Sequence, residues 1–149
     1  MEISGKIRSL LRGKGGEVWS LAPAATVYDA VAMMADKRVG ALLVVEGTEI
    51  VGIVSERDYA RKVILRGRSS HDTPVAEIMS SPVVTVTPDA TIAECMRIVT
   101  EHRFRHLPVV ENGKVTGMVS IGDLVNWVIT EQQETIRHLE AWIAGTPGN

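Results

Sequence analysis

The chain has 149 residues, of which 45% are hydrophobic and 23% are charged, and its formal net charge is −2. This length supports one or two small domains with a real core, and the small negative charge argues against a nucleic-acid binder, which needs a basic surface. The single cysteine excludes an internal disulfide, and no apolar run approaches the ~20 residues of a membrane span. We therefore expect a cytoplasmic protein with neither a nucleic-acid nor a membrane partner.

The first 16 residues, "MEISGKIRSLLRGKGG", lack the apolar stretch of a signal peptide. Their apolar positions Ile3, Ile7, Leu10 and Leu11 are spaced as on one face of a helix. The segment is predicted to be a short docking helix, and a membrane-surface anchor is the less supported alternative.

The chain repeats itself at an offset of 65 residues. When residues 23–59 are set against 88–124 without a gap, 12 of the 37 pairs are identical, among them Gly52/Gly117, Ser55/Ser120 and Asp58/Asp123. An ungapped match of this length indicates a tandem duplication. Two copies are too few for a solenoid, so the two units are expected to pack on each other about a pseudo-two-fold axis.

Each copy is predicted to follow the order β-α-β-β-α. An extended piece, "EVWSLAP" or "PVVTVTP", leads into a Thr-x-x-acid helix start at Thr26 or Thr91. Two β-rich runs follow, and Asn112-Gly113 suits the tight turn of the second copy. Cys95 lies on the apolar stripe of a helix, where a buried structural thiol is expected.

The predicted organisation has five parts. They are an N-terminal segment (1–16), a first repeat (17–66), a connection (67–81), a second repeat (82–130) and a C-terminal helix and tail (131–149). The connection contains "TPVAEIM", a predicted short helical turn with Pro74 near its start.

Residues 124–144 are predicted to form one helix. Its apolar residues recur at intervals of three and four, interrupted by Gln132: Val125, Ile129, Ile136, Leu139 and Ile143. Such a stripe needs a partner surface, either in its own domain or in a second subunit.

These features resemble the CBS (cystathionine-β-synthase) domain pair, or Bateman module. The resemblance rests on "GIVSERD" (52–58), "GMVSIGD" (117–123), "RHLPVV" (105–110) and "VAEIMSSPVVTV", and it covers roughly residues 17–130. It implies an α+β fold of two β-α-β-β-α repeats with adenine-nucleotide sites in clefts between them, and a homodimer. In the first repeat Leu43 replaces the expected Pro, and Gly40-Ala41 stand where the second repeat has Arg105-His106, so the two clefts are not expected to be equivalent.

The Ser-x-x-Asp motifs allow two interpretations. Ser55 and Ser120 can simply cap helices, with Asp58 and Asp123 in the first turn. Alternatively, the helix N-terminus and the serine bind phosphate while the aspartate accepts two ribose hydroxyls. The resemblance favours the second interpretation, and both roles can coexist.

Further nucleotide contacts are predicted around these motifs. Arg57, Arg105 and His106 are candidate phosphate ligands, because guanidinium and imidazole suit phosphate. Arg38 and Arg103 are assigned a structural role at helix ends. The remaining candidates line the adenine and the cleft: Val18, Trp19, Ser20, Ala41, Val84, Thr85 and Pro108. Trp19 could equally belong to the core.

No catalytic constellation is visible. The chain has neither a G-x-x-x-x-G-K-[ST] nor a G-x-G-x-x-G loop, and its four histidines lack metal-ligand spacing. The sequence therefore predicts a non-catalytic regulatory module that needs no cofactor, binds AMP, ATP or NAD(H), and signals to an unidentified effector protein. The alternative is a structural or dimerisation module without a nucleotide, and a nucleotide-processing catalyst is the weakest option.

Overall fold

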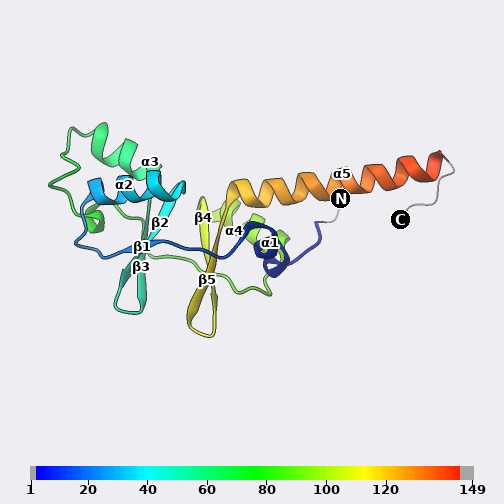
Figure 1. Cartoon of the computed structure of the whole chain (residues 1–149), viewed down its shortest axis with the longest axis horizontal. Coiled ribbons are helices and arrows are strands. Elements are labelled where there is room, and N and C mark those ends of the chain that lie inside the picture. The colour runs from blue at the N-terminus through cyan, green and yellow to red at the C-terminus, as the bar shows by residue number, and fades with distance from the viewer. Residues whose placement is uncertain (1–2, 145–149) are drawn as a thin grey trace. The chain divides into compact units, whose positions relative to one another are not determined.

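The computed structural model describes residues 3–144, which form two compact units (Figure 1). The first unit is Glu17–Thr85, and the second combines the residues up to Gly16 with those from Val86 onward. Both units mix helices and strands, which confirms the α+β class. None of the helices between residues 3 and 144 is both long and apolar enough to cross a lipid bilayer.

The first unit contains a three-stranded sheet in the order β1-β2-β3. β1 (Ser20–Leu21) runs parallel to β2 (Ala41–Glu46), which is antiparallel to β3 (Glu49–Ser55). The helical segments are α2 (Val27–Lys37), α3 (Glu56–Tyr59), a π-helical turn (Ala60–Ile64) and a 3-10 turn (Val75–Glu77). The 3-10 turn is the helical turn predicted after Pro74.

The core of the first unit lies between α2, the sheet and the 3-10 segment. Its members are fully or almost fully buried: Val27, Ala30, Met34, Leu42, Val44, Val54, Val63, Val75 and Ile78. The apolar stripe of α2 thus meets the alternating apolar positions of β2 and β3, as the two periodicities require.

The second unit contains α1 (Ile7–Lys14), α4 (Ile92–His102), β4 (His106–Glu111), β5 (Lys114–Ser120) and α5 (Ile121–Ile143). β4 and β5 form an antiparallel hairpin, and Asn112 and Gly113 turn it with φ of 53° and 77°. These angles confirm the predicted tight turn. The predicted C-terminal helix is also confirmed, and its last turns extend beyond the other elements of its unit (Figure 1). Residues 145–149 of the predicted tail lie outside the described residues.

Matching caps begin and end the first helix of each repeat. Thr26 Oγ1 accepts a hydrogen bond from Asp29 N (3.1 Å) at the start of α2, and Thr91 Oγ1 accepts one from Glu94 N (3.0 Å) at the start of α4. α2 ends at Arg38 and α4 at Arg103, both left-handed, with φ of 57° and 58°. The predicted helix starts and the structural role of the two arginines are confirmed.

One predicted strand is wrong. "PVVTVTP" forms only an isolated parallel bridge between Val86 and Val109, not a strand. In the first unit Leu43 N donates to Trp19 O (3.0 Å), which helps to form β1. Pro108 aligns with Leu43 and has no N–H to donate, so the pairing stops at that single bridge.

The segment that precedes each repeat packs on the other repeat. In the second unit Ile7 N donates to Ala90 O (2.9 Å) and Arg8 N to Pro88 O (2.8 Å). In the first unit the aligned carbonyls, those of Ala25 and Pro23, accept from Val75 N (2.8 Å) and Ala76 N (3.1 Å). Ile7 and Leu10 are buried, which confirms the docking helix. Residues 5–11 are therefore equivalent to 73–79, at an offset of 68 rather than 65.

Candidate functional site

Each Ser-x-x-Asp motif forms a complete capping box. Ser55 Oγ accepts from Asp58 N (3.2 Å), while Asp58 Oδ2 accepts from Ser55 N (2.9 Å). At the start of α5, Ser120 Oγ accepts from Asp123 N (3.1 Å) and Asp123 Oδ2 accepts from Ser120 N (2.8 Å). The capping interpretation is therefore structurally complete in both units.

The hairpin of the second unit brings the basic pair beside its motif. His106 lies opposite Ser120 in the β4–β5 register, and Arg105 O accepts a hydrogen bond from Ile121 N (3.0 Å). Arg105, His106, Ser120 and Asp123 thus meet where β4 begins and α5 starts. A guanidinium and an imidazole in one place suit an anion such as phosphate.

The first unit has the same backbone arrangement with different chemistry. Ala41 lies opposite Ser55, and Gly40 O accepts from Glu56 N (3.1 Å). The residue equivalent to His106 is therefore the buried, apolar Ala41. Arg57, which lies inside the Ser-x-x-Asp motif of this unit, is exposed on the first turn of α3.

A lysine pairs with the aspartate of each motif, but the two lysines come from different elements. Asp58 Oδ1 lies 3.0 Å from Lys62 Nζ, one helical turn away, and Lys62 also donates to Ile78 O (2.8 Å). Asp123 Oδ2 lies 2.5 Å from Nζ of Lys14, the last residue of α1, which also donates to Met118 O (2.5 Å). The two aspartates are thus neutralised by a local partner in one unit and a remote one in the other.

These contacts set the ionisation of Asp123. Burial acts to raise the pKa of this carboxyl, but the hydrogen bonds from Lys14 and Ser120 outweigh burial, so its pKa lies below the ordinary 3.8. The carboxylate is therefore charged at neutral pH.

The predicted adenine-contacting residues divide between surface and core. Val18 and Trp19 are half-buried, and Trp19 packs against the core of the first unit with Lys37 Nζ 4.3 Å from its ring centroid. Ser20 and Thr85 are exposed, and Val84 is half-buried. Pro108 is buried within β4. The core role left open for Trp19 is thus present.

Sequence reasoning missed both lysines. The Asp58–Lys62 spacing of four residues is a detectable signal for a helical ion pair. Nothing local identifies Lys14, because 109 positions separate it from Asp123. The apolar pattern Ile7, Leu10, Leu11, which matches Val75, Ile78, Met79, would have indicated where its helix docks.

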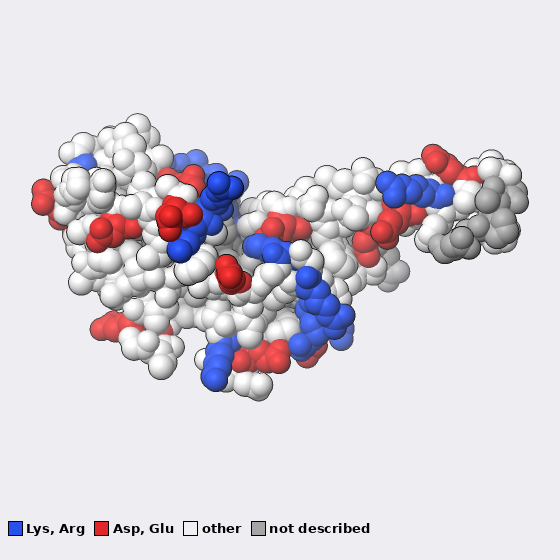
Figure 2. All heavy atoms as spheres, in the orientation of Figure 1, with Lys and Arg blue, Asp and Glu red and all other residues white. Residues whose placement is uncertain are grey.

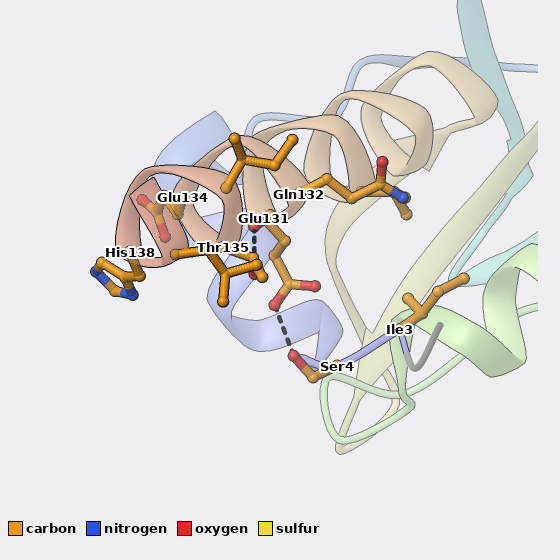
Figure 3. A pocket seen from close by; sticks show the side chains of 10 residues that line it. Ile3, Ser4, Glu131, Gln132, Glu134, Thr135 and His138 are labelled. Carbon is orange, nitrogen blue, oxygen red and sulfur yellow. Dashed lines mark hydrogen bonds between the residues drawn. The ribbon is translucent and has the colours of Figure 1, made fainter. Parts of the chain in front are cut away.

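A groove of about 480 Å³ lies along α5 and away from these motifs. Figure 3 shows Ile3 and Ser4 facing the helix, with Ser4 Oγ donating to Glu131 Oε1 (2.6 Å). Its apolar wall includes Ile136 and Leu139, and none of the predicted nucleotide-binding residues lines it. The groove therefore belongs to the surface of α5.

The thiol and the side chains of metal-ligating type are possible reactive groups among the described residues. Cys95 is buried, and burial, together with the nearby Glu94, raises the pKa of its thiol to about 11, so it is a poor nucleophile. Between residues 3 and 144, no three His, Cys, Asp or Glu side chains lie together as a metal site. On the face in Figure 2, basic and acidic side chains are intermingled without a continuous basic strip.

Comparison with known proteins agrees with this architecture. The CBS domain family model matches residues 16–65 and 75–130, so the chain belongs to the CBS domain family. One solved structure is that of a signal-transduction protein with CBS domains from Burkholderia ambifaria MC40-6. It is 49% identical to this chain, with a TM-score of 0.80, and the match covers 86% of this chain and 96% of that one. The CBS-domain protein ATU1752 from Agrobacterium tumefaciens is 33% identical with a TM-score of 0.76, over 82% and 98% of the two chains.

Two curated relatives are named as CBS-domain proteins as well. The mitochondrial CBSX3 of Arabidopsis thaliana is 46% identical over 125 residues, which are 80% of this chain and 61% of that protein. YhcV of Bacillus subtilis (strain 168) is 32% identical over 108 residues, or 72% and 76% of the two chains. The chain thus spans about three fifths of the Arabidopsis relative. Signal transduction is named for the Burkholderia protein, and the names of the other proteins described above give the CBS domain alone.

Proposed function

We propose that this chain is a non-catalytic sensor that binds an adenine nucleotide, AMP, ATP or NAD(H), at its Ser-x-x-Asp motifs and signals to a partner protein. The observation that carries the proposal is the meeting of Arg105, His106 and Asp123 at the N-terminus of α5. The Arg105 guanidinium and the His106 imidazole suit the phosphates, and a charged aspartate suits the vicinal ribose hydroxyls.

The two motifs should bind differently. The second unit offers Arg105 and His106, whereas the first offers Arg57 and presents Gly40 and Ala41 at the equivalent strand start. A site with fewer phosphate-binding side chains is expected to bind phosphate more weakly. We therefore expect the first motif to have lower affinity for a phosphorylated ligand or a different preferred ligand.

A homodimer is part of the proposal. Val125, Ile129, Gln132, Ile136, Leu139 and Ile143 alternate intervals of four and three along α5, which is the seam of a two-stranded coiled coil. Ile136 is 53% exposed and Leu139 57%, so their own unit leaves this stripe uncovered. A second copy of α5 carries the matching pattern, and Gln132 is the one polar position that would select the register.

A cytoplasmic location also belongs to the proposal, together with the absence of any catalytic cofactor. The buried, unpaired Cys95 fits a reducing compartment.

The competing function is a structural or dimerisation module without a nucleotide. The complete capping boxes and the Lys62–Asp58 and Lys14–Asp123 pairs favour it, because they give both aspartates a role without a ligand. Loss of a cap alone costs about 1 kcal/mol of stability, and Asn caps nearly as well as Asp. The two functions therefore differ in whether Asp→Asn changes binding.

Calorimetric titration of the full chain with AMP, ATP, NADH and adenosine tests this. Asp123→Asn should weaken nucleotide binding by about ten- to a hundredfold, since a charged hydrogen-bond partner contributes about 1.5–3 kcal/mol. Arg105→Ala should weaken the binding of AMP and leave the binding of adenosine nearly unchanged. Asp36→Asn, an exposed aspartate on α2, is the matched control. Absence of binding at millimolar ligand, or unchanged affinity in both Asp58→Asn and Asp123→Asn, would establish the capping function instead.

A further inference from the structure

Lys14 occupies the carboxylate that the proposed site needs. Its Nζ contacts Asp123 Oδ2 and Met118 O, each at 2.5 Å. The same Oδ2 also accepts Ser120 N at 2.8 Å. In a bidentate contact each ribose hydroxyl donates to one carboxylate oxygen, and Oδ2 already accepts from two donors. A ribose bound in this way must displace the ammonium group from Oδ2.

The helix that carries Lys14 is fixed at its other end. Ile7 and Leu10 are buried, and Ile7 N and Arg8 N donate to backbone carbonyls of Ala90 and Pro88. The Arg8 guanidinium lies 3.1 Å from Glu111 and 3.4 Å from Asp89. The side chain of Lys14 can therefore move away from Asp123 while α1 stays docked on its unit. Because the lysine side chain has four flexible carbons, its ammonium group remains close to the site.

Leu11 fixes the last turn of α1 as well. A Cβ placed on Gly117 would lie 2.8 Å from Leu11 Cδ2, so this leucine rests directly on the β5 backbone. Leu11 precedes Lys14 by three residues and lies on the same side of the helix. The contact thus holds Lys14 at the start of α5.

The displaced ammonium distinguishes two kinds of ligand. When unphosphorylated adenosine binds, Lys14 loses its anionic partner and gains none. When the ligand carries phosphate, the freed ammonium obtains a new anionic partner next to Arg105 and His106. In the first unit Lys62, in the π-helical turn that follows α3, contacts Asp58 Oδ1, while Oδ2 accepts from Ser55 N. That ion pair therefore joins residues four positions apart.

We propose that Lys14 is a specificity-determining residue that makes the Asp123 site select phosphorylated nucleosides over adenosine. The inference rests on the proposed nucleotide-binding function. It assigns the N-terminal helix a role in ligand choice, in addition to packing.

The test is calorimetric titration with AMP and adenosine in an Asp58→Asn background. This change weakens binding at the first motif, so the measured heat of binding comes mainly from the second unit. Lys14→Met keeps the aliphatic stem and removes the charge. It should strengthen adenosine binding and weaken AMP binding, so that the AMP-to-adenosine affinity ratio falls by roughly fivefold or more, the scale of one partly exposed ion pair on each ligand. Lys14→Arg should preserve the ratio.

Two controls separate selectivity from a structural effect. Lys6→Met removes the same charge at the start of α1, away from Asp123, and should leave the ratio unchanged. Adding Asp123→Asn should abolish the gain in adenosine affinity that Lys14→Met produces, because the ion pair is then absent.

The outcomes separate this inference from the proposed function. If wild type binds AMP and Lys14→Met keeps the same AMP-to-adenosine ratio, the role of Lys14 is wrong while nucleotide binding stands. If neither wild type nor Lys14→Met binds either ligand at millimolar concentration, both are overturned.

Discussion

Gly52 and Gly117 occupy the same place in the two units, and each is covered by a large side chain from the segment that precedes the other repeat. Met79 covers Gly52 in the first unit, and Leu11 covers Gly117 in the second. Neither glycine has a positive φ, so their missing side chains serve close packing rather than backbone freedom. The duplication therefore includes the docking segments as well as the hairpins.

Gly117→Ala should destabilise the protein by about 1–3 kcal/mol, because the new methyl group would lie 2.8 Å from Leu11 Cδ2 and overpack the contact. Urea unfolding measures the change. Leu11→Ala in the same chain should restore part of the loss, which identifies the steric cause. Gly13→Ala is the control, since no atom lies within 4 Å of its added Cβ, and it should be neutral or stabilising. If Gly13→Ala were also destabilising, the loss of stability in Gly117→Ala could not be assigned to the contact with Leu11.

The fold was largely predictable because the duplication doubles each local signal. Thr26 and Thr91 start helices, Arg38 and Arg103 end them, and Asn112 turns a hairpin, all through interactions within a few residues. The prediction of the second entering strand was wrong because Pro108 has no N–H to donate. That residue was visible in the sequence, but its effect depends on which strand pairs with it.

The candidate site was less predictable. Ser120 and Asp123 were predicted because they are adjacent along one helix turn. Lys14 could not be placed, because its position depends on α1 docking on the second repeat rather than on the first repeat, which it precedes. The equivalence of 5–11 with 73–79 escapes an ungapped comparison, since the chain between segment and repeat differs by three residues.

Arg103→Gly should stabilise the protein by about 0.5–1 kcal/mol. Arg103 adopts a left-handed φ of 58°, which is costly for a residue with a Cβ and free of that cost for glycine. Thermal and urea unfolding measure the gain. Arg97→Gly, an exposed arginine within α4, should have the opposite sign and cost about 1 kcal/mol. Equal effects of both changes would argue that backbone conformation at position 103 is not the determining factor.

Truncation after Thr130 should weaken self-association, because it removes Ile136, Leu139 and Ile143 from the exposed stripe of α5. Leu139→Asp should act in the same direction without shortening the chain, since a charge in a coiled-coil seam is unfavourable. Sedimentation velocity at tens of micromolar, roughly the range of a stable dimer, measures both. Arg137→Ala, outside the seam, should leave association unchanged. A monomeric full-length chain at this concentration would rule out the proposed dimer.

The Lys14–Asp123 pair should make stability depend on pH in the acid range. The folded-state pKa of Asp123 lies below its ordinary 3.8, so the folded protein holds fewer protons on this group than the unfolded chain does. The stabilisation is therefore fully present above the unfolded-state pKa and is lost as pH falls through the folded-state pKa. Wild type should thus lose more unfolding free energy than Lys14→Met between pH 7 and pH 3.

Measuring the same pH series in Asp123→Asn isolates the contribution of the pair from that of the rest of the protein. The difference between wild type and Lys14→Met should disappear once Asp123 is replaced, because no carboxylate is left for the lysine to stabilise. Lys6→Met should follow wild type throughout the series. A pH dependence that is identical in wild type and Lys14→Met would mean that Lys14 does not hold the charged form of Asp123 in solution.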